Sequence, residues 1–219
     1  MPHAGPTRIA RNPMGFDFDI PARADYAVHT FVGGNAFMLE LLNTHRQELA
    51  VTADKANFVR TIEATRRQLA EATAKLAIGP LARDGGVLSF AVAIENLCGH
   101  KFPSGYPARR AWLHVEVVQD GKVVFASGAV DDRGRLVGVA DELRVPHVRT
   151  VEKPGDVAVY EMVAADPAGA PTTYLTKMVK RAKDNRLLPR GWRQDGPHVA
   201  HTAPVGVDVG PETGVFVAV

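Results

Sequence analysis

Residues 112–128, WLHVEVVQDGKVVFASG, have the pattern of a β-hairpin. Leu113, Val115 and Val117 alternate with other side chains, and a second apolar run covers residues 123–125. Asp120 and Gly121 stand between the two runs, and this dipeptide favours the two-residue turn that joins antiparallel strands. The stretch therefore predicts antiparallel β-structure with a hairpin turn at Asp120-Gly121.

The same two-residue period appears upstream, in VLSFAVAIEN at residues 87–96. Downstream, the turn-forming segments DDRG (131–134), KPGD (153–156) and DPAG (166–169) separate further strand-like runs, including VAVYEMV (157–163), PVGVDV (204–209) and GVFVAV (214–219). Strands that follow one another without helical patterns between them are typical of two packed sheets. We therefore predict a mainly β fold, an antiparallel immunoglobulin-like β-sandwich over residues 79–219. Its predicted core consists of Leu88, Phe90, Val92, Ile94, Leu113, Val115 and Val117.

Residues 34–78 have a helical period instead. Apolar side chains recur every three or four residues from Met38 to Leu49, and again from Phe58 to Leu76. A break at residues 50–53 separates the two runs, so we predict an α-helical hairpin or linker before the sandwich. Residues 1–33 are rich in Pro, Gly and Arg without sustained periodicity, which predicts an extended lead-in with little regular structure.

Composition excludes several classes of partner. The net charge of +2 results from 26 basic and 24 acidic residues that are spread along the chain, so we expect neither nucleic acid nor an anionic membrane surface as a partner. No apolar run approaches the roughly 18 residues that span a bilayer. The first residues, MPHAGPTRIARNPMGFDFDIP, lack the apolar centre of a secretion signal, so this chain is predicted to carry none.

Three stretches are unusually rich in reactive, charged, glycine or proline residues. They are NLCGHKFPSGYPARRAW at 96–112, KDNRLLPRGW at 183–192 and HTFVGGNAFMLELL at 29–42. The first two, together with VPHVRTVEKPGDVAVYEMV at 145–163, resemble the C-terminal β-sandwich region of a group of multihaem c-type cytochromes. The third resembles the segment that follows the last haem-binding motif in such proteins.

This resemblance implies a function and a cofactor. The chain would be the non-haem C-terminal module of a multihaem electron-transfer protein, packed against a haem-bearing N-terminal region or a partner cytochrome. Haem c is implied for the whole family protein, and a periplasmic or extracellular location with it. Covalent attachment needs Cys-x-x-Cys-His, whereas Cys98 is the single cysteine of this chain, so we expect no covalent haem here. Because family members often run that motif directly into Met-Pro, Met1-Pro2 suggests an internal methionine taken as the start, with loss of the haem domain as the alternative.

His29 is the candidate distal haem ligand. By resemblance it would bind a haem carried upstream, and Gly33 and Gly34 would let the backbone lie close to a flat cofactor. The alternative is a surface or capping histidine at the start of a helix.

His100, Lys101, Arg109 and Arg110 are further candidates for cofactor binding. His100 would contact the edge of a haem or donate to a propionate, and the three cations would pair with that carboxylate. The alternative is that His100 and its glycines fix a crossover between strands while the basic pair binds nearby acids such as Glu95 and Asp120.

The remaining candidates give weaker patterns. Cys98 has His100 two residues away but no orienting acid or oxyanion donor in the sequence, so we predict a small apolar role and no enzyme. His198 and His201, with Asp208, are a possible metal cluster, although the neighbouring Pro and Gly residues favour a loop there. His147 receives no assigned role.

Two classes of function remain open. The segment 183–192 is interpreted either as a docking surface for the haem domain or as an ordered loop that closes the sandwich, with Trp192 as its anchor. The chain as a whole is either the cytochrome module or a stand-alone β-sandwich binding module for a protein or carbohydrate.

Overall fold

The computed structural model describes residues 3–8, 14, 20–28, 30, 32–207 and 214–219. The chain divides into two compact units, Met1–Gln68 and Leu69–Val219, hereafter the helical unit and the β unit. Among the described residues of the lead-in, the regular structure is a short ladder between β1 (His3–Ala4) and β2 (Tyr26–Ala27).

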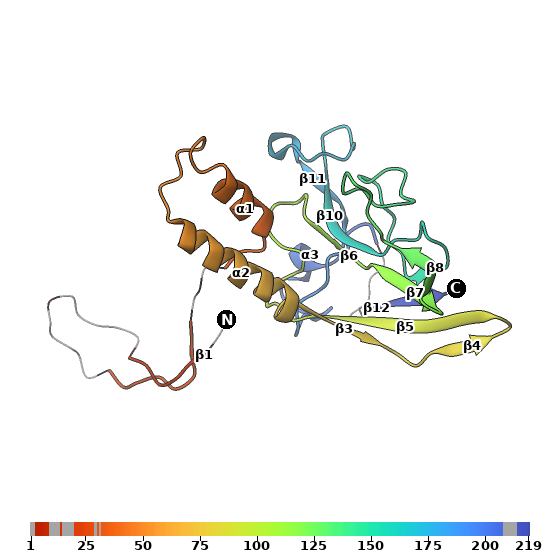
Figure 1. The fold of residues 1–219 in the computed structure, drawn as a ribbon, viewed down its shortest axis with the longest axis horizontal. Coiled ribbons are helices and arrows are strands. Elements are labelled where there is room, and N and C mark those ends of the chain that lie inside the picture. The colour runs from red at the N-terminus through yellow and green to blue at the C-terminus, as the bar shows by residue number, and fades with distance from the viewer. Residues whose placement is uncertain (1–2, 9–13, 15–19, 29, 31, 208–213) are drawn as a thin grey trace. The chain divides into compact units, whose positions relative to one another are not determined.

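Two helices form the rest of the helical unit (Figure 1). Helix α1 (Ala36–Thr44) begins at Asn35, whose side chain accepts a hydrogen bond from the Met38 amide at 3.0 Å. Helix α2 (Lys55–Glu71) buries Phe58, Ile62 and Thr65, as its period predicted. An ion pair between Arg66 and Glu40 joins the two helices.

Both helices are shorter than the segments in which apolar residues recur at helical spacing. Helix α1 ends at Thr44, and residues 45–50 form turns in place of the predicted last helical turn. Helix α2 ends at Glu71, and β3 (Ala74–Ile78) occupies the segment that we predicted as helix up to Leu76. The predicted helical linker at 34–78, with its second helix up to Leu76, is therefore wrong at its end, because β-ladder pairing with a downstream strand outweighs a weak local helical period.

A long β-hairpin opens the β unit (Figure 1). Strand β3 and β4 (Ala82–Asp84) both pair antiparallel with β5 (Val87–Asn96). Gly85 and Gly86, with φ of 53° and 89°, form the two-residue turn, which needs positive φ at both positions. Strand β5 matches the alternating run predicted at residues 87–96.

Strand β5 lies inside a five-stranded sheet with the order β3-β5-β12-β9, in which β4 is the fifth strand and also pairs with β5. Strand β9 is Thr150–Val151 and β12 is Gly214–Ala218. A second sheet has the order β11-β10-β6, formed by Lys180–Asp184, Val159–Ala165 and Arg110–Trp112. Strands β7 (Val115–Gln119) and β8 (Lys122–Ser127) make the predicted hairpin, with positive φ at Asp120 and Gly121. The fold is mainly β, as predicted.

Two features depart from a purely antiparallel arrangement. Strands β9 and β12 pair in parallel, through Phe216 with Thr150 and Val217 with Val151. Short helices also stand between strands, namely η1 (Leu175–Lys177) and α3 (Val199–Thr202). The prediction that every pairing is antiparallel is therefore wrong at the β9 edge. Strands β9 and β12 are not consecutive in the chain, so a crossover connection joins them and allows them to run in the same direction.

The main core of the β unit lies between side chains of the two larger sheets and of the β7–β8 hairpin. Phe90, Val92, Ile94, Leu113 and Val115 are buried in it, as predicted, with Leu88 and Val117 packed at its margin. A second cluster covers the other face of β10 and consists of Leu136, Val145, Val157 and Val159. Strand β10 is therefore buried on both faces.

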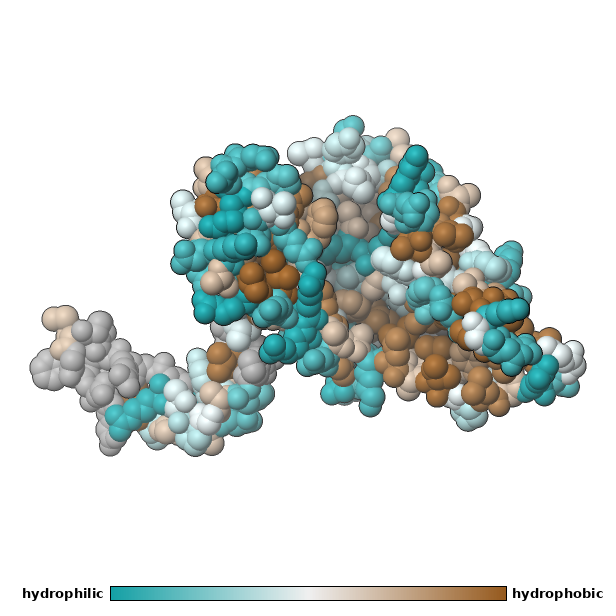
Figure 2. Space-filling view, viewed as in Figure 1, coloured by the Kyte–Doolittle hydropathy of each residue, from teal (hydrophilic) through white to brown (hydrophobic). Residues whose placement is uncertain are grey.

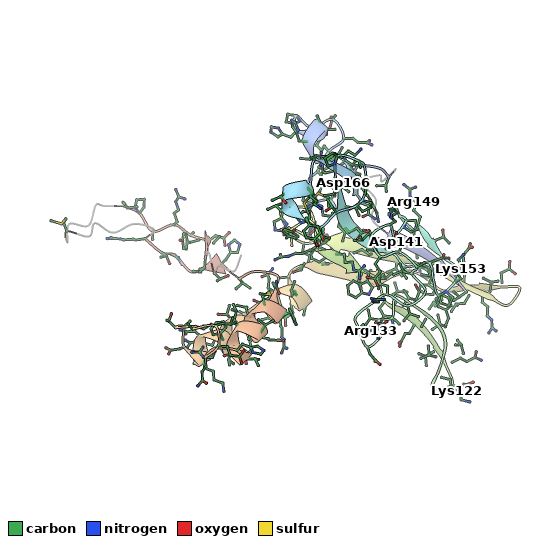
Figure 3. All side chains as sticks on the ribbon, turned by 90° about the horizontal axis from the view of Figure 1, so that it is seen from above. Lys122, Arg133, Asp141, Arg149, Lys153 and Asp166 are labelled. Carbon is green, nitrogen blue, oxygen red and sulfur yellow. The ribbon has the colours of Figure 1, made fainter. Side chains whose placement is uncertain are left out.

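In the predicted turns at 131–134 and 166–169, aspartate side chains accept hydrogen bonds from backbone amides. The Asp131 carboxylate accepts hydrogen bonds from the Arg133 and Arg135 amides, each at 2.9 Å, and Asp166 accepts one from the Ala170 amide at 2.8 Å. Charged side chains of both signs, including Arg133 and Asp166, project from the β unit (Figure 3).

Gly128 is required where β8 ends. Its φ is +76°, and a Cβ atom would lie 2.2 Å from the Leu113 carbonyl oxygen. The Trp112 indole donates to the Gly128 carbonyl at 3.0 Å. This close approach fixes β8 against the point where the chain passes from β6 to β7.

Candidate functional site

The structure brings together the two stretches of the β unit that the sequence singled out, 96–112 and 183–192. Phe102 and Leu187 exchange backbone hydrogen bonds of 3.0 and 2.8 Å. The buried Asn96 amide donates to the carbonyls of His100, Leu187 and Leu188 at 2.8, 3.1 and 3.3 Å, and its oxygen accepts from the Cys98 amide at 2.9 Å. One asparagine side chain therefore joins both stretches.

Asp184 is the centre of a buried ion network beneath the same loop. Its side chain is fully buried, and it accepts from Lys101 Nζ at 2.8 Å and from Arg186 Nε and Nη2 at 2.8 and 2.9 Å. Burial alone would raise the pKa of the Asp184 carboxyl, but hydrogen bonds from Arg186 and Lys101 outweigh burial and lower it. Burial also lowers the pKa of Lys101, and this outweighs the opposite effect of the hydrogen bond that Lys101 donates to Asp184. The predicted propionate partner Lys101 thus already has a carboxylate partner within the chain.

Asn185 connects the loop to β10 and to His147. Its oxygen accepts from the Glu161 amide at 2.9 Å and its nitrogen donates to the Val159 carbonyl at 2.7 Å, which fixes the orientation of the side-chain amide. The same nitrogen lies 3.0 Å from His147 Nδ1, so this ring nitrogen accepts and the imidazole is neutral. Burial lowers the pKa of His147, and the charges of Lys183 and Arg149 lower it further.

The 96–110 loop also has a solvent-exposed side, which here means its exposed side chains. His100, Tyr106 and Arg109 are exposed. His100 Nδ1 lies 3.0 Å from the Lys101 carbonyl, Arg109 donates to the Ser104 carbonyl at 3.1 Å, and the Tyr106 hydroxyl donates to the Thr173 carbonyl. His100, Lys101 and Arg109 thus each have a hydrogen-bond partner within the chain.

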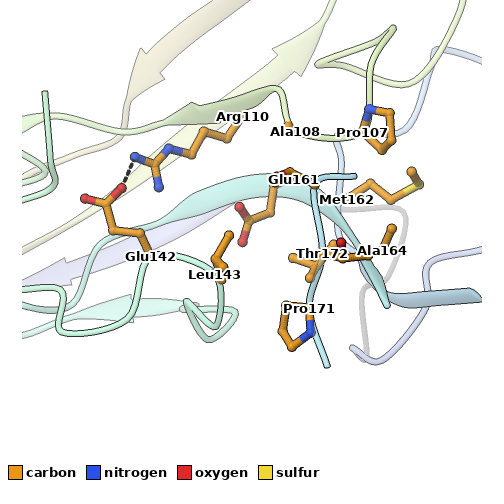
Figure 4. A pocket seen from close by; sticks show the side chains of 12 residues that line it. Pro107, Ala108, Arg110, Glu142, Leu143, Glu161, Met162, Ala164, Pro171 and Thr172 are labelled. Carbon is orange, nitrogen blue, oxygen red and sulfur yellow. Dashed lines mark hydrogen bonds and ion pairs between the residues drawn. The ribbon is translucent and has the colours of Figure 1, made fainter. Parts of the chain in front are cut away.

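Arg110 lies at the edge of a cavity of about 260 Å³ (Figure 4). Its guanidinium pairs with Glu142 and lies 5.8 Å from the centre of the Trp112 ring. Burial would raise the pKa of Glu142, but hydrogen bonds from Arg110 and the Leu136 amide lower it. Buried Glu161, bound by Lys183 at 2.9 Å, is a second carboxylate of the lining. The remaining lining is mainly small or apolar and includes Pro107, Leu143, Met162, Ala164 and Pro171.

Sequence reasoning missed Asp184, Glu142 and Glu161 as buried or partly buried charges. Glu161 carries one usable signal, because a charged residue inside the apolar run VAVYEMV is rarely buried unless it is paired. The other two stand among polar residues, where nothing in the local pattern distinguishes a network from a solvated loop.

The remaining candidate residues are His29, Asp208, His198 and His201. His29 lies outside the described residues, as does Asp208. His198 precedes α3 and His201 is part of it, so the loop expected there contains a short helix. In the part of the chain that the structure describes, no three His, Cys, Asp or Glu side chains form a group able to hold a metal ion.

Cys98 and Trp192 take structural positions. Cys98 Sγ lies 3.7 Å from the Thr73 carbonyl, and burial raises the pKa of its thiol, which disfavours the thiolate. The Trp192 indole donates to Thr202 at 3.1 Å, and Arg190 Nε donates to Glu95 at 2.9 Å. These contacts hold the 183–192 segment against other parts of the β unit.

Comparison of the chain with protein-family models, with curated proteins and with solved structures found no match. Among the helices of the described residues, none is long and apolar enough to cross a membrane.

Proposed function

We propose that this chain is the non-haem C-terminal module of a multihaem c-type cytochrome-like electron-transfer protein, and that it packs against a haem-bearing region or a partner cytochrome. The proposal places the protein in the periplasm or outside the cell and treats the sheets of the β unit as an immunoglobulin-like sandwich. Its starting point is the resemblance of residues 96–112 and 183–192 to that family.

The observation that carries the proposal is the division of the 96–110 loop into two sides. Asn96, Lys101 and Phe102 bind residues 184–188 on the inner side, which holds the loop rigidly. His100 and Arg109 face outwards from this rigid support. An imidazole and a guanidinium held in place in this way suit hydrogen bonds to haem propionates, because little side-chain and loop entropy is lost on docking.

The test begins with the reading frame upstream of Met1, where we expect an in-frame Cys-x-x-Cys-His motif. Expressed with a c-type maturation system, the extended protein should carry covalent haem, whereas this chain alone should carry none because it has one cysteine. A haem stain on this chain after denaturing electrophoresis would contradict the proposal. An upstream frame without the motif would contradict the haem-bearing region of the same protein and leave the partner cytochrome.

Two substitutions in the extended protein separate the roles. His29→Ala should leave the covalent haem content unchanged and alter the iron spectrum and potential, since it would remove a distal ligand. Arg109→Ala should shift the potential without changing the coordination of the iron. His114→Ala, at a half-exposed histidine of the β unit, is the matched control and should change neither.

The cavity beside Arg110 favours a second candidate function, a stand-alone module that binds a protein or carbohydrate. Its apolar lining with a few charged groups is typical of a ligand pocket. Carbohydrate and peptide libraries, screened by nuclear magnetic resonance against the parent and Ala164→Trp, would test this function. Binding to the parent that the filled cavity abolishes would favour it over the cytochrome module.

A further inference from the structure

Strand β3 has an open edge whose hydrogen-bonding groups can be assigned. The Leu97 amide donates to the Thr73 carbonyl at 3.0 Å, and the Gly79 amide donates to the Ala91 carbonyl at 2.8 Å. Hydrogen-bonded pairs alternate along an antiparallel ladder, so residues 73, 75, 77 and 79 direct their backbone groups towards β5. Ala74, Leu76 and Ile78 therefore direct theirs away from it. Within the described part of the chain, β3 pairs with no strand other than β5.

Apolar side chains accompany this edge. Leu76 and Ile78 stand opposite the buried Ile94 and Val92 in the ladder, so they lie on the core-facing side of the sheet. Yet their exposed fractions are 57% and 68%. Apolar residues gather on the surface along the β3–β5 hairpin (Figure 2). An edge strand that combines free backbone groups with exposed apolar side chains is a template for another strand.

The length and symmetry of the edge indicate which strand fits. Pro80 has no amide hydrogen, and between Gly79 and Ala82 the pairing with β5 shifts by one residue, so the regular open edge ends near Ile78. The five residues Ala74–Ile78 that remain are self-complementary about Leu76. In an antiparallel pairing of two such strands, Leu76 meets Leu76 and Ala74 meets Ile78, and all of these positions direct their backbone groups away from β5.

The charges also permit this pairing. Lys75 would stand opposite Ala77 of the other strand and not opposite a second lysine. Within its own sheet Lys75 stands opposite Glu95, whose negative charge lies on the same face. Direct like-charge opposition, which destabilises paired strands, is therefore absent from this register.

We propose that two copies of this chain associate through antiparallel pairing of β3 with β3, with the two-fold axis at Leu76. The five-stranded sheets of the two copies then form one continuous sheet across the axis. Because a single pair of five-residue strands buries little surface, the dimer should be weak, with a dissociation constant of about 10–100 μM.

Charge substitutions at the axis provide the first test. By analytical ultracentrifugation the full chain should shift from monomer to dimer as its concentration rises. Leu76→Lys and Leu76→Glu should each remain monomeric, because a like charge then faces itself, and an equimolar mixture should recover the dimer as a heterodimer. Val118→Lys, at a position with a matching exposed fraction of 56%, should dimerise like the parent.

Cross-linking provides the second test. Hydrogen-bonded antiparallel pairs have Cα atoms about 5.5 Å apart, within the range that a disulfide spans. In a Cys98→Ala background, mild oxidation should convert Leu76→Cys into a covalent dimer and leave Val118→Cys largely monomeric. A parent that stays monomeric at about 200 μM, roughly twentyfold above the tightest dissociation constant expected, would overturn the proposal. A parent dimer that survives Leu76→Lys, or equal cross-linking at residues 76 and 118, would also overturn it.

Discussion

The helical unit and the β unit treat buried polar groups in opposite ways. In the β unit, Asp184, Asn185 and Asn96 are buried and each makes several hydrogen bonds. In the described part of the chain, the buried side-chain atoms without a hydrogen-bond partner are Asn43 Oδ1, Arg46 Nη1 and Thr65 Oγ1, all in the helical unit. An unpaired buried polar atom costs free energy, whereas a paired one offsets its desolvation.

This contrast indicates how each unit obtains a unique structure. The β unit depends on matched polar partners that only one arrangement of its loops satisfies. The helical unit depends on the apolar contacts of Phe58 and Ile62. It also contains the buried polar atoms named above, which make no stabilising hydrogen bond. Removing a buried polar group should therefore destabilise the β unit and stabilise the helical unit.

The largest effect is expected for Asp184→Ala, which leaves Lys101 and Arg186 partly buried without their carboxylate. We expect the β unit to lose about 3–5 kcal/mol of unfolding free energy. Tryptophan fluorescence during urea unfolding measures this, because Trp112 and Trp192 both belong to the β unit. Asp195→Ala removes an exposed carboxylate that pairs with Arg193 and should leave the midpoint unchanged. Equal losses in the two variants would contradict the central role of Asp184.

Gly128→Ala tests the precision of the β-unit backbone. Its Cβ would meet the Leu113 carbonyl oxygen at 2.2 Å, so we expect a loss of at least about 2 kcal/mol in the same assay. Gly134→Ala is the matched control, because Gly134 also has positive φ but no atom lies within 4 Å of its Cβ position. Its cost should be limited to backbone strain of about 1 kcal/mol. A smaller loss at residue 128 than at 134 would show that the loop moves freely.

Acidification should weaken the β unit through His147. The pKa of His147 in the folded protein lies below 6.5, its ordinary value in the unfolded chain. At a pH between the folded and unfolded pKa values, the unfolded chain therefore binds more protons than the folded protein. Unfolding free energy should thus be constant above about pH 7 and fall as the pH drops below 6.5, by at most about 1.4 kcal/mol per pH unit from this group. Urea unfolding at a series of pH values measures the slope. His147→Gln, which can still accept from Asn185, should flatten it, and an unchanged slope would assign the effect to other groups.

Thr65→Val should have the smallest effect and the opposite sign. It replaces a fully buried hydroxyl that has no hydrogen-bond partner with a methyl group of similar size. We expect a gain of about 0.5–1 kcal/mol in the helical unit, measured by far-ultraviolet circular dichroism during thermal unfolding. The control is Thr61→Val, because the Thr61 hydroxyl donates to the Asn57 carbonyl at 2.8 Å. Destabilisation by Thr65→Val would remove the contrast between the two units.

The candidate site was predictable only in part. The sequence located both stretches that meet, 96–112 and 183–192, because their Gly, Pro and charged residues are unusual between strands. It did not predict that Lys101 binds Asp184, 83 residues away, in place of an external carboxylate. Partner choice depends on which loops the sheets bring together, and several acids were equally plausible from local sequence.

Local chemistry determined by itself the features that depend on neighbouring residues. The alternation in residues 87–96 predicted strand β5 with its buried face, and Asp120-Gly121 predicted the β7–β8 hairpin, because side-chain period and turn geometry are set within a few residues. Only the tertiary structure decided that Ala74–Ile78 form a strand, that β9 runs parallel to β12, and that Asp184 is buried. Each of these depends on pairing between distant segments, whose free energy appears only once the whole sheet has formed.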